Sequence, residues 1–440
     1  MTAPSLLLAL ALAAAGASAA CVQVPNQDYD QGSGGVSAPA ADADACCAQC
    51  AAAGDACWAS VFDVATGGVC WLKSRDQTTR PAYNPAVIGC WLTGRTPPPM
   101  PPPPPPPPYN VSVVDLPSDP VLSFLPPLAN TDWPQSFNPA FVEATPATGG
   151  KRGLLVRSQN CSGVAPGQCI ACNVDGRWPI APYFPGSVLT FAELRGDGSF
   201  ARPYLVFAPD GPDEDYGTED PRLAYDPATK LYHLMYTCYS NVTGGNLCHA
   251  TTLDPTLPYP GAWTRLPRVF PSRGFTKSGA LLIRPQGPPH FLYWGDSSIH
   301  LAVTQDLVVF TTVNESFIAP RADHFDSGLC EAGPLPMLLA DGNYIFFHNS
   351  ATANGYVYHP GFVILNGTDP TQILQRSEDA LLSPTADWEV GNAPAACNVP
   401  NVVFLEAVTR APSGTDLFDV YFGGSDAVVG TARISVVRNS

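Results

Sequence analysis

Short apolar runs, separated by polar and turn-forming residues, recur along the chain from about residue 110 to its end. The clearest examples lie at residues 153–158, 203–208, 231–237, 290–295, 343–349 and 418–424. Runs of this length that are rich in Val, Leu, Ile, Phe and Tyr, and that are bounded by Gly, Pro, Asn and Asp, predict β-strands. No long helical pattern interrupts them, so we expect an all-β domain over residues 110–440, either a β-propeller or a sandwich.

A different pattern occupies residues 21–95, where seven of the 14 cysteines of the chain lie. The Cys- and Ala-rich segment that begins at Cys46 predicts a helix, and the apolar runs at 58–62 and 69–73 predict short strands. A region this short cannot bury a large core, so we expect disulfides to stabilise it as a small α+β module.

A proline tract at residues 96–109 separates the two regions. Such a tract forms a polyproline II helix of about 3.1 Å per residue and acts as a semi-rigid spacer. Recognition by an SH3-type domain is the alternative, and an extracellular location disfavours it.

Residues 1–20 form an apolar run that ends in small residues, which predicts a secretory signal peptide followed by Cys21. A lipoprotein cut before Cys21 is the alternative. The 14 cysteines and the N-x-Ser/Thr sequons fit an exported glycoprotein, secreted or associated with the cell wall. The sequons begin at Asn110, Asn160, Asn241, Asn314 and Asn366.

The formal net charge of −16 argues against nucleic acid and anionic membranes as partners, because both require clustered Lys and Arg. No segment after residue 20 has the roughly 20 apolar residues that a membrane span needs. We expect a neutral partner such as an oligosaccharide.

The segment 216–227, YGTEDPRLAYDP, carries the strongest chemical signal. It places Glu219, Asp220, Pro221 and Arg222 at the start of an apolar run. Since neighbouring strand residues point to opposite faces, only one of the two acids is expected to face a propeller axis. A carboxyl group in a half-dry funnel has a raised pKa, as a proton donor to a glycosidic oxygen requires. A structural turn in which Asp220 and Arg222 form an ion pair is the alternative.

The cysteine-rich region resembles the PAN/apple domain family, on the order of its C-x-x-C, its later cysteine beside an aromatic residue, and its C-W-L-K strand. The resemblance implies the bridges Cys21–Cys90 and Cys50–Cys57, and a bridge from Cys46 or Cys47 to Cys70. It also implies that the module binds protein or glycan and is not catalytic.

The second region resembles the five-bladed β-propellers of glycoside hydrolase family 130, which are β-mannoside phosphorylases and hydrolases. The segments that carry the resemblance occur in order between about residues 138 and 437, and the Glu-Asp-Pro-Arg element and the G-x-x-D segment at 423–426 are the most specific of them. The resemblance implies that Asp220 is the general acid and that Arg157 and Asp426 contact the sugar. It further places Lys277 near the anion site of the family and His348 at a strand end of the binding funnel.

Two departures from the family pattern concern its phosphate site. Asp296 follows the strand at which relatives place an arginine, and Leu329 and Glu331 stand where relatives have a lysine and a glycine. The two acids repel phosphate, so we expect an inverting hydrolase in which Glu331 is the general base for water. A propeller that only binds glycan or protein, and a phosphorylase with an altered anion site, are the alternatives.

The predicted site therefore consists of the catalytic residues Asp220 and Glu331 and of six substrate-binding residues, namely Arg157, Arg222, Lys277, Asp296, His348 and Asp426. The sequence predicts no metal ion and no cofactor. Of the remaining cysteines, we expect Cys238 and Cys248 to link a hairpin, Cys330 to pair with another cysteine such as Cys397, and at least two of Cys161, Cys169 and Cys172 to pair.

Overall fold

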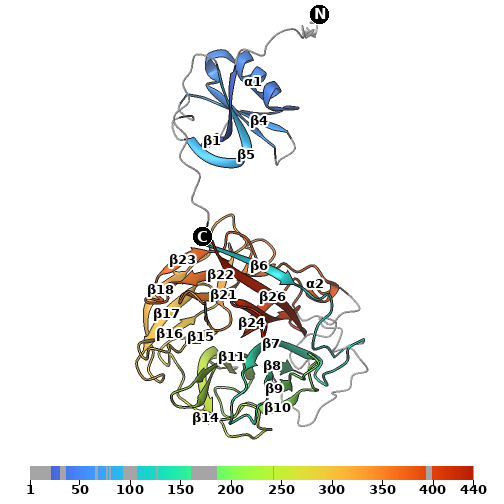
Figure 1. Cartoon of the computed structure of the whole chain (residues 1–440), viewed down its shortest axis with the longest axis vertical. Helices are drawn as coiled ribbons and strands as arrows, with labels where there is room; N and C mark the ends of the chain where they lie inside the picture. The colour runs from blue at the N-terminus through green and yellow to red at the C-terminus, as the bar shows by residue number, and fades with distance from the viewer. Residues whose placement is uncertain are drawn as a thin grey trace, which may run out of the picture. The chain divides into compact units, whose positions relative to one another are not determined.

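The computed structural model describes residues 21–29, 36–64, 68–75, 78, 81–92, 107–124, 127–159, 186–240, 242–392 and 399–439. The chain separates into two compact units, Met1–Pro106 and Pro107–Ser440 (Figure 1). The predicted signal peptide, the sequons at Asn160 and Asn241, and four of the cysteines lie outside the described residues.

The N-terminal unit is one five-stranded sheet with a helix against it. The sheet has the order β1-β5-β3-β4-β2. Its elements are β1 (Cys21–Tyr29), β2 (Val36–Pro39), α1 (Ala43–Ala52), η1 (Gly54–Ala56), β3 (Ala59–Asp63), β4 (Val69–Lys73) and β5 (Pro81–Leu92). The carboxylate of Asp42 caps α1 by accepting a hydrogen bond of 2.7 Å from the amide of Ala45. The helix and the two strands that the sequence predicted here, β3 and β4, are confirmed.

The disulfides of this unit differ in part from the expectation. Cys46–Cys70 and Cys50–Cys57 are formed, but Cys21, Cys47 and Cys90 are free thiols. The expected bridge Cys21–Cys90 is wrong, because the β1–β5 register pairs Cys21 with Leu92 and Cys90 with Gln23. Cys21 and Cys90 are thus diagonal rather than directly opposite on the two strands, a position in which Cα atoms usually lie farther apart than a disulfide spans. The assignment of this unit to the PAN/apple family stays a prediction.

The second unit is a five-bladed β-propeller whose blades are antiparallel sheets. Blade 1 is β7 (Gln135–Val142), β8 (Gly153–Gln159), β9 (Val188–Glu193) and β10 (Tyr204–Phe207). Blade 2 is β11 (Gly217–Asp226), β12 (Leu231–Ser240), β13 (Gly244–Thr252) and β14 (Thr264–Arg265). Blade 3 is β15 (Gly279–Leu282), β16 (His290–Trp294), β17 (Ile299–Thr304) and β18 (Thr311–Ile318).

Blade 4 contains β19 (Leu329–Ala332), β20 (Met337–Leu338), β21 (Tyr344–Ala351), β22 (Tyr358–Leu365) and β23 (Ile373–Arg376). Blade 5 contains β24 (Val403–Arg410), β25 (Leu417–Gly424), β26 (Val428–Arg438) and, as its outer strand, β6 (Tyr109–Asp115). The short helix α2 (Asp387–Val390) precedes blade 5. All six apolar runs that predicted strands coincide with strands of the propeller, and Cys238–Cys248 links β12 to β13 as expected.

Hydrophobic cores lie between neighbouring blades, and the period-2 alternation of the strands builds them. On β15, Ala280 and Leu282 pack toward blade 4, whereas Leu281 packs toward blade 2. The same pattern produces a buried cluster at each junction from blade 1 to blade 5 and another where blade 5 meets blade 1. Each strand therefore needs apolar residues on both faces, which explains its nearly continuous hydrophobic sequence.

Strand β6 closes the ring, because it comes first in the unit and pairs with the last strand, β26. The register runs from Tyr109 opposite Arg438 to Asp115 opposite Arg433. Tyr109 is buried in the core between blades 4 and 5, and its hydroxyl accepts a 2.6 Å hydrogen bond from Asn343 and donates to Asp341. None of the described helices is long and apolar enough to span a membrane.

Removal of the closing strand should destabilise the propeller far more than removal of the unit before it. A chain that starts at Pro107 keeps β6, whereas one that starts at Pro117 leaves the edge of β26 unpaired and opens the core around Tyr109. We expect the melting temperature of the shorter chain to be lower by on the order of 10 °C or more. Thermal unfolding followed by circular dichroism tests this, and equal melting temperatures would show that β6 does not hold the ring closed.

Candidate active site

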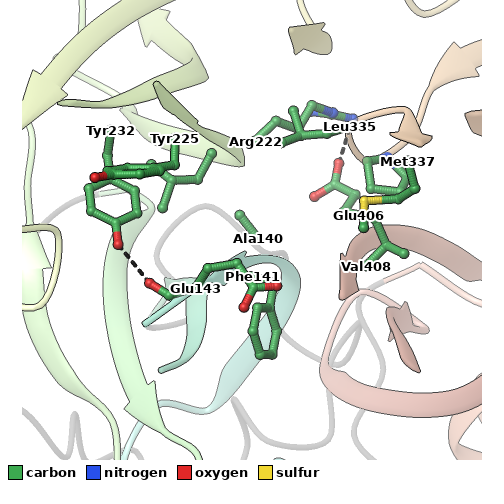
Figure 2. A pocket seen from close by; sticks show the side chains of 12 residues that line it. Ala140, Phe141, Glu143, Arg222, Tyr225, Tyr232, Leu335, Met337, Glu406 and Val408 are labelled. Atoms are coloured by element: carbon green, nitrogen blue, oxygen red, sulfur yellow. Dashed lines mark hydrogen bonds and ion pairs between the residues drawn. The ribbon is translucent and has the colours of Figure 1, made fainter. Parts of the chain in front are cut away.

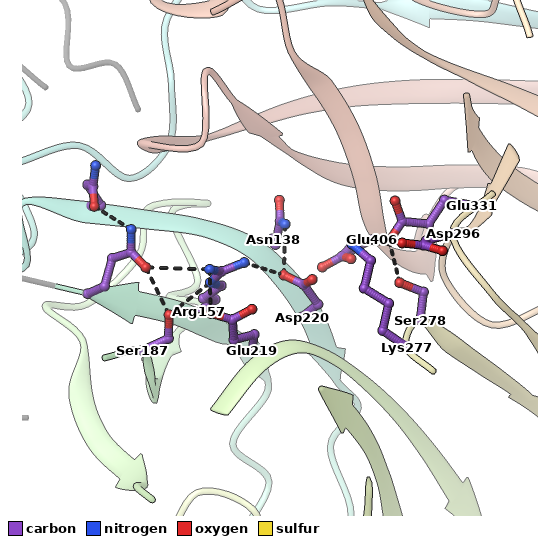
Figure 3. A network of polar contacts seen from close by, with 12 residues as sticks. Asn138, Arg157, Ser187, Glu219, Asp220, Lys277, Ser278, Asp296, Glu331 and Glu406 are labelled. Carbon is purple, nitrogen blue, oxygen red and sulfur yellow. Dashed lines mark hydrogen bonds and ion pairs between the residues drawn. The ribbon is translucent and has the colours of Figure 1, made fainter. Parts of the chain in front are cut away.

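Polar side chains from all five blades converge on one cavity of about 110 Å³ at the propeller axis. Of its polar residues, Asn138, Asp220 and Glu331 lie on the inner strands β7, β11 and β19, and Lys277 lies just before β15 (Figure 3). Arg157, Tyr358 and Asp426 come from β8, from β22 and from the turn between β25 and β26. The cavity is lined by Asn138, Arg157, Asp220, Lys277, Glu331, Tyr358, Val399, Val402, Phe404 and Asp426. Five of the eight predicted site residues are thus brought together: Arg157, Asp220, Lys277, Glu331 and Asp426.

Irregularities in the ladders of three inner strands direct polar side chains to the axis. The register shifts beside Asn138 on β7, between Glu219 and Arg222 on β11, and beside Glu406 on β24. Asn138 and Asp220 have left-handed backbones, with φ of 47° and 48°, and each is followed by a proline. Bulges of this kind change the direction of a side chain and commonly lie beside functional sites.

Asp220 is held by one cation and one amide. It accepts a hydrogen bond of 2.8 Å from Nη1 of Arg157 and one of 3.0 Å from Nδ2 of Asn138. Arg157 also contacts Glu219, at 2.7 Å from Nη2, and Ser187, at 3.0 Å from Nε. Of the two adjacent acids only Asp220 lines the cavity, as expected, but the bulge at Asp220 breaks the strict alternation and lets both acids contact Arg157.

Lys277 lies on the other side of the cavity and is surrounded by acids. Its Nζ is 3.2 Å from Oε1 of Glu331 and 3.9 Å from Oδ2 of Asp296. The hydroxyl of Ser278 also donates a hydrogen bond to Glu331. Lys277 therefore lies between the two predicted catalytic carboxyl groups, and its charge acts on both.

Asp426 reaches the cavity from the turn between β25 and β26. Ser425 and Asp426 both have left-handed backbones, with φ of 46° and 51°, as in the tight turns that join twisted strands. Neighbouring Gly423 leaves room for Asn138, since a Cβ atom there would lie 2.4 Å from its side-chain oxygen. The turn thus positions one acid and admits the amide that holds Asp220.

The protonation of the carboxyl groups follows their partners. Burial alone raises the pKa of Asp220, but Arg157, Lys277 and Arg222 outweigh it, so the pKa is lowered. Burial raises the pKa of Glu331 despite the opposing charge of Lys277, and it raises the pKa of Asp426 to about 7. The raised pKa that the sequence argument gave to Asp220 is therefore wrong for the unliganded protein, in which the pKa is lowered at Asp220 and raised at Glu331 and Asp426.

Three predicted substrate-binding residues lie outside the cavity lining. The guanidinium of Arg222 is fully buried against Glu406 and backbone carbonyls, so it offers no donor to a sugar. His348 is buried, its Nδ1 lies 2.9 Å from Oγ of Ser350, and burial lowers its pKa to about 3, so it is a neutral core residue. Asp296 lies beside Lys277 but does not line the cavity.

Several residues of the site were not predicted from the sequence. Asn138, Tyr358 and Phe404 line the cavity, and Glu406 lies beneath it. A polar residue inside an apolar run was the available signal for Asn138 and Glu406. Nothing in the local pattern distinguishes Tyr358 from the many aromatic residues that fill the blade cores.

Cys330, beside Glu331, is a free and fully buried thiol, and burial raises its pKa to about 11. Its expected partner Cys397 lies outside the described residues, as do Cys161, Cys169 and Cys172. Among the described residues, no group of three or more His, Cys, Asp or Glu side chains is arranged to hold a metal ion.

Comparison with known proteins gives a consistent family. The family model described as β-1,4-mannooligosaccharide phosphorylase matches residues 191–438. The β-1,2-mannobiose phosphorylase of Thermoanaerobacter sp. strain X514 is 33% identical over 103 residues, which are 23% of this chain and 30% of that protein. The 1,2-β-oligomannan phosphorylase of the same organism is 26% identical over 223 residues, which are 50% of this chain and 69% of that protein. The match thus spans less than a third of the first relative.

Solved structures share the propeller. A glycosyl hydrolase from Bacteroides ovatus aligns with a TM-score of 0.56 at 23% identity, over 72% of this chain and 92% of that chain. The β-1,2-mannobiose phosphorylase from Listeria innocua, in complex with β-1,2-mannobiose, aligns with a TM-score of 0.53 at 19% identity, over 68% of this chain and 89% of that chain. At this identity the likeness concerns the fold.

The raised pKa of Asp426 predicts a pH-dependent stability. Because its pKa rises from 3.8 to about 7 on folding, its contribution is fully present below about pH 4 and is lost as the pH rises toward 7. Asp426→Asn removes the ionisation, so the stability of the variant relative to wild type should increase by up to about 4 kcal/mol between pH 4 and pH 8. Denaturant unfolding at both pH values measures this difference, and the exposed Asp119→Asn is the control. A pH-independent difference would contradict the burial of this charge.

Proposed function

Since the chain belongs to glycoside hydrolase family 130, we propose that it hydrolyses a β-mannoside or a related glycan with inversion at the anomeric carbon. The site cavity takes the terminal sugar, and Asp220 and Glu331 serve as the two carboxyl groups that an inverting glycosidase needs on opposite sides of the bond.

One observation carries the choice of water as the nucleophile: among the described residues, each cation at the axis is already paired with an acid. Arg157 contacts Glu219 and Asp220, and Lys277 contacts Glu331 and Asp296. Arg222 is paired with Glu406. A phosphate ion would have to displace a carboxylate from one of these cations.

The balance of charge strengthens this argument. In the described part of the chain, three cations face six carboxyl groups around the axis, and burial raises the pKa of four of these carboxyl groups. The six are Glu219, Asp220, Asp296, Glu331, Glu406 and Asp426. A phosphate ion would be repelled by whichever of these carboxyl groups are ionised and would oppose ionisation of the rest, whereas a neutral sugar and water would not.

Phosphorolysis is the second candidate, and two observations favour it. The curated relatives are mannoside phosphorylases, and Lys277 lines the cavity beside the predicted acid. Rotation of Glu331 away from Lys277 would free one cation for phosphate.

The role of Asp220 follows the family resemblance, whereas Glu331 is assigned as the base because it is an acid where relatives have a glycine. Asp220 donates a proton to the leaving oxygen, and Glu331 removes a proton from water. In the unliganded site Arg157, with Lys277 and Arg222, lowers the pKa of Asp220, so a role as acid requires that the bound sugar weaken these contacts, for example by drawing Arg157 toward Glu219. The reverse assignment, with Glu331 as the acid and Asp220 as the base, fits the resting charges and is separated by the second experiment below.

We also propose that the protein is exported and that its N-terminal unit is an arm that binds protein or glycan. The apolar run at residues 1–20 and the disulfides of both units support export, because disulfides persist mainly in oxidising compartments.

Product analysis on manno-oligosaccharides separates the candidate reactions. We expect free mannose as the product at equal rates with and without inorganic phosphate, and α-mannose as the first anomer detected by NMR. Formation of mannose 1-phosphate, with little turnover in the absence of phosphate, would establish phosphorolysis instead. Binding without turnover would indicate a lectin-like propeller.

Two variants assign the acid and the base. Asp220→Asn should lower kcat on oligosaccharides by about 10²–10⁴-fold and have little effect on a dinitrophenyl β-mannoside, whose leaving group needs no proton. Glu331→Ala should be inactive on both substrates, and azide should restore turnover with formation of an α-mannosyl azide. If azide rescues Asp220→Ala and the activated substrate rescues Glu331→Gln, the roles are reversed.

A further inference from the structure

The inner strands carry a second cavity of about 110 Å³ that is separate from the site cavity (Figure 2). Along β7, β11 and β24, the residues that line the site cavity precede those that line the second cavity in sequence, as Asn138 precedes Ala140 and Phe404 precedes Glu406. The two cavities therefore lie toward opposite ends of the inner strands. Arg222 and Glu406 line the second cavity and not the site cavity.

Arg222 and Glu406 form a fully buried ion pair at this level of the axis. Nη2 of Arg222 lies 2.6 Å from Oε1 of Glu406, and both side chains have 0% exposure. Within the described part of the chain, neither carboxylate oxygen of Glu406 has a hydrogen bond of good geometry. Glu406 therefore compensates the charge of Arg222 mainly by proximity.

The guanidinium of Arg222 joins the backbones of the two catalytic segments. Its Nη1 donates a hydrogen bond of 2.9 Å to the carbonyl of Asp220, in blade 2. Its Nη2 and Nε donate bonds of 2.6 Å and 3.0 Å to the carbonyls of Ala332 and Gly333, which directly follow Glu331 in blade 4. Blades 2 and 4 are not adjacent in the ring, so their acids are not held by a core between two neighbouring blades.

We propose that the Arg222–Glu406 pair is a positioning device, which fixes the separation of Asp220 and Glu331 across the axis and thereby keeps room for the nucleophile between them. The proposal rests on the proposed function in one respect only, the identification of these two acids as the catalytic pair. Arg222 supplies the connection, and Glu406 makes its burial tolerable, because an uncompensated charge at this depth is strongly destabilising. The bulge beside Glu406 directs its carboxylate to the axis.

A matched control separates positioning from ordinary stabilisation. Asp326, in the segment between β18 and β19, has 0% side-chain exposure and is paired with Arg321 and Arg376 at 2.9 Å and 2.6 Å, but it does not line the site cavity. Asp326→Asn therefore removes a comparable buried charge without touching the link between the acids.

The test compares Glu406→Gln, the apolar double variant Arg222→Met/Glu406→Leu, and Asp326→Asn. We expect both axial variants to lower kcat at least tenfold with KM changed less than threefold, since the sugar contacts remain while the geometry of the acids is lost. Asp326→Asn should lower the melting temperature and leave kcat within twofold of wild type. The double variant buries no charge, so it should fold even if Glu406→Gln does not.

Crystal structures of the same proteins provide a readout that does not depend on turnover. We expect the distance between the carboxyl groups of Asp220 and Glu331 to differ from that in wild type by more than about 0.5 Å, the tolerance of a catalytic site, in the axial variants only. If wild type cleaves no mannoside, the proposed function fails, and this distance alone decides the positioning role. An unchanged distance, or a loss of kcat in Asp326→Asn equal to that of the axial variants, would overturn the proposal.

Discussion

A buried charged group needs a partner of opposite charge, and at the axis of this propeller this requirement determines which side chains contact one another. The inner strands bring carboxylates and cations together where little water can solvate them, so each cation is held by acids: Arg157 by Glu219 and Asp220, Lys277 by Glu331, and Arg222 by Glu406. Ion pairs at this depth are expensive to break from one side only. Substrate hydroxyl groups must therefore compete with contacts that are already made.

The regular part of the molecule could be predicted from its sequence because its cause is local. Apolar residues on both faces of each run, as in 279–282 on β15, specify a strand between two packed blades. The identity of β6 as the closing strand could not be predicted this way, since its partner is chosen by ring closure and lies at the far end of the chain.

The sequence predicted which residues form much of the site, but it did not predict how their side chains are arranged. The family resemblance selected Asp220, Arg157, Lys277 and Asp426, a departure from the family pattern selected Glu331, and the fold brings these five together. The strict alternation of side chains between the two faces of the strand fails at Asp220. Its left-handed backbone before a proline is imposed by tertiary structure, and no local sequence preference indicates it. The predicted direction of the pKa shift of Asp220 was wrong for the same reason, since this direction depends on Arg157, which lies in another blade.

The ring closure by β6 also has a consequence for the order of events during synthesis. The strand leaves the ribosome before any blade, yet its partner β26 lies more than 300 positions later. Until then the chain carries an unpaired strand at one end and incomplete blade interfaces at the other, and closing so long a loop costs entropy before any contact repays it. The contact order of this pairing is very high, which makes completion of the ring a slow, late step. A nascent propeller of this topology therefore exposes unpaired strand edges until β26 pairs with β6.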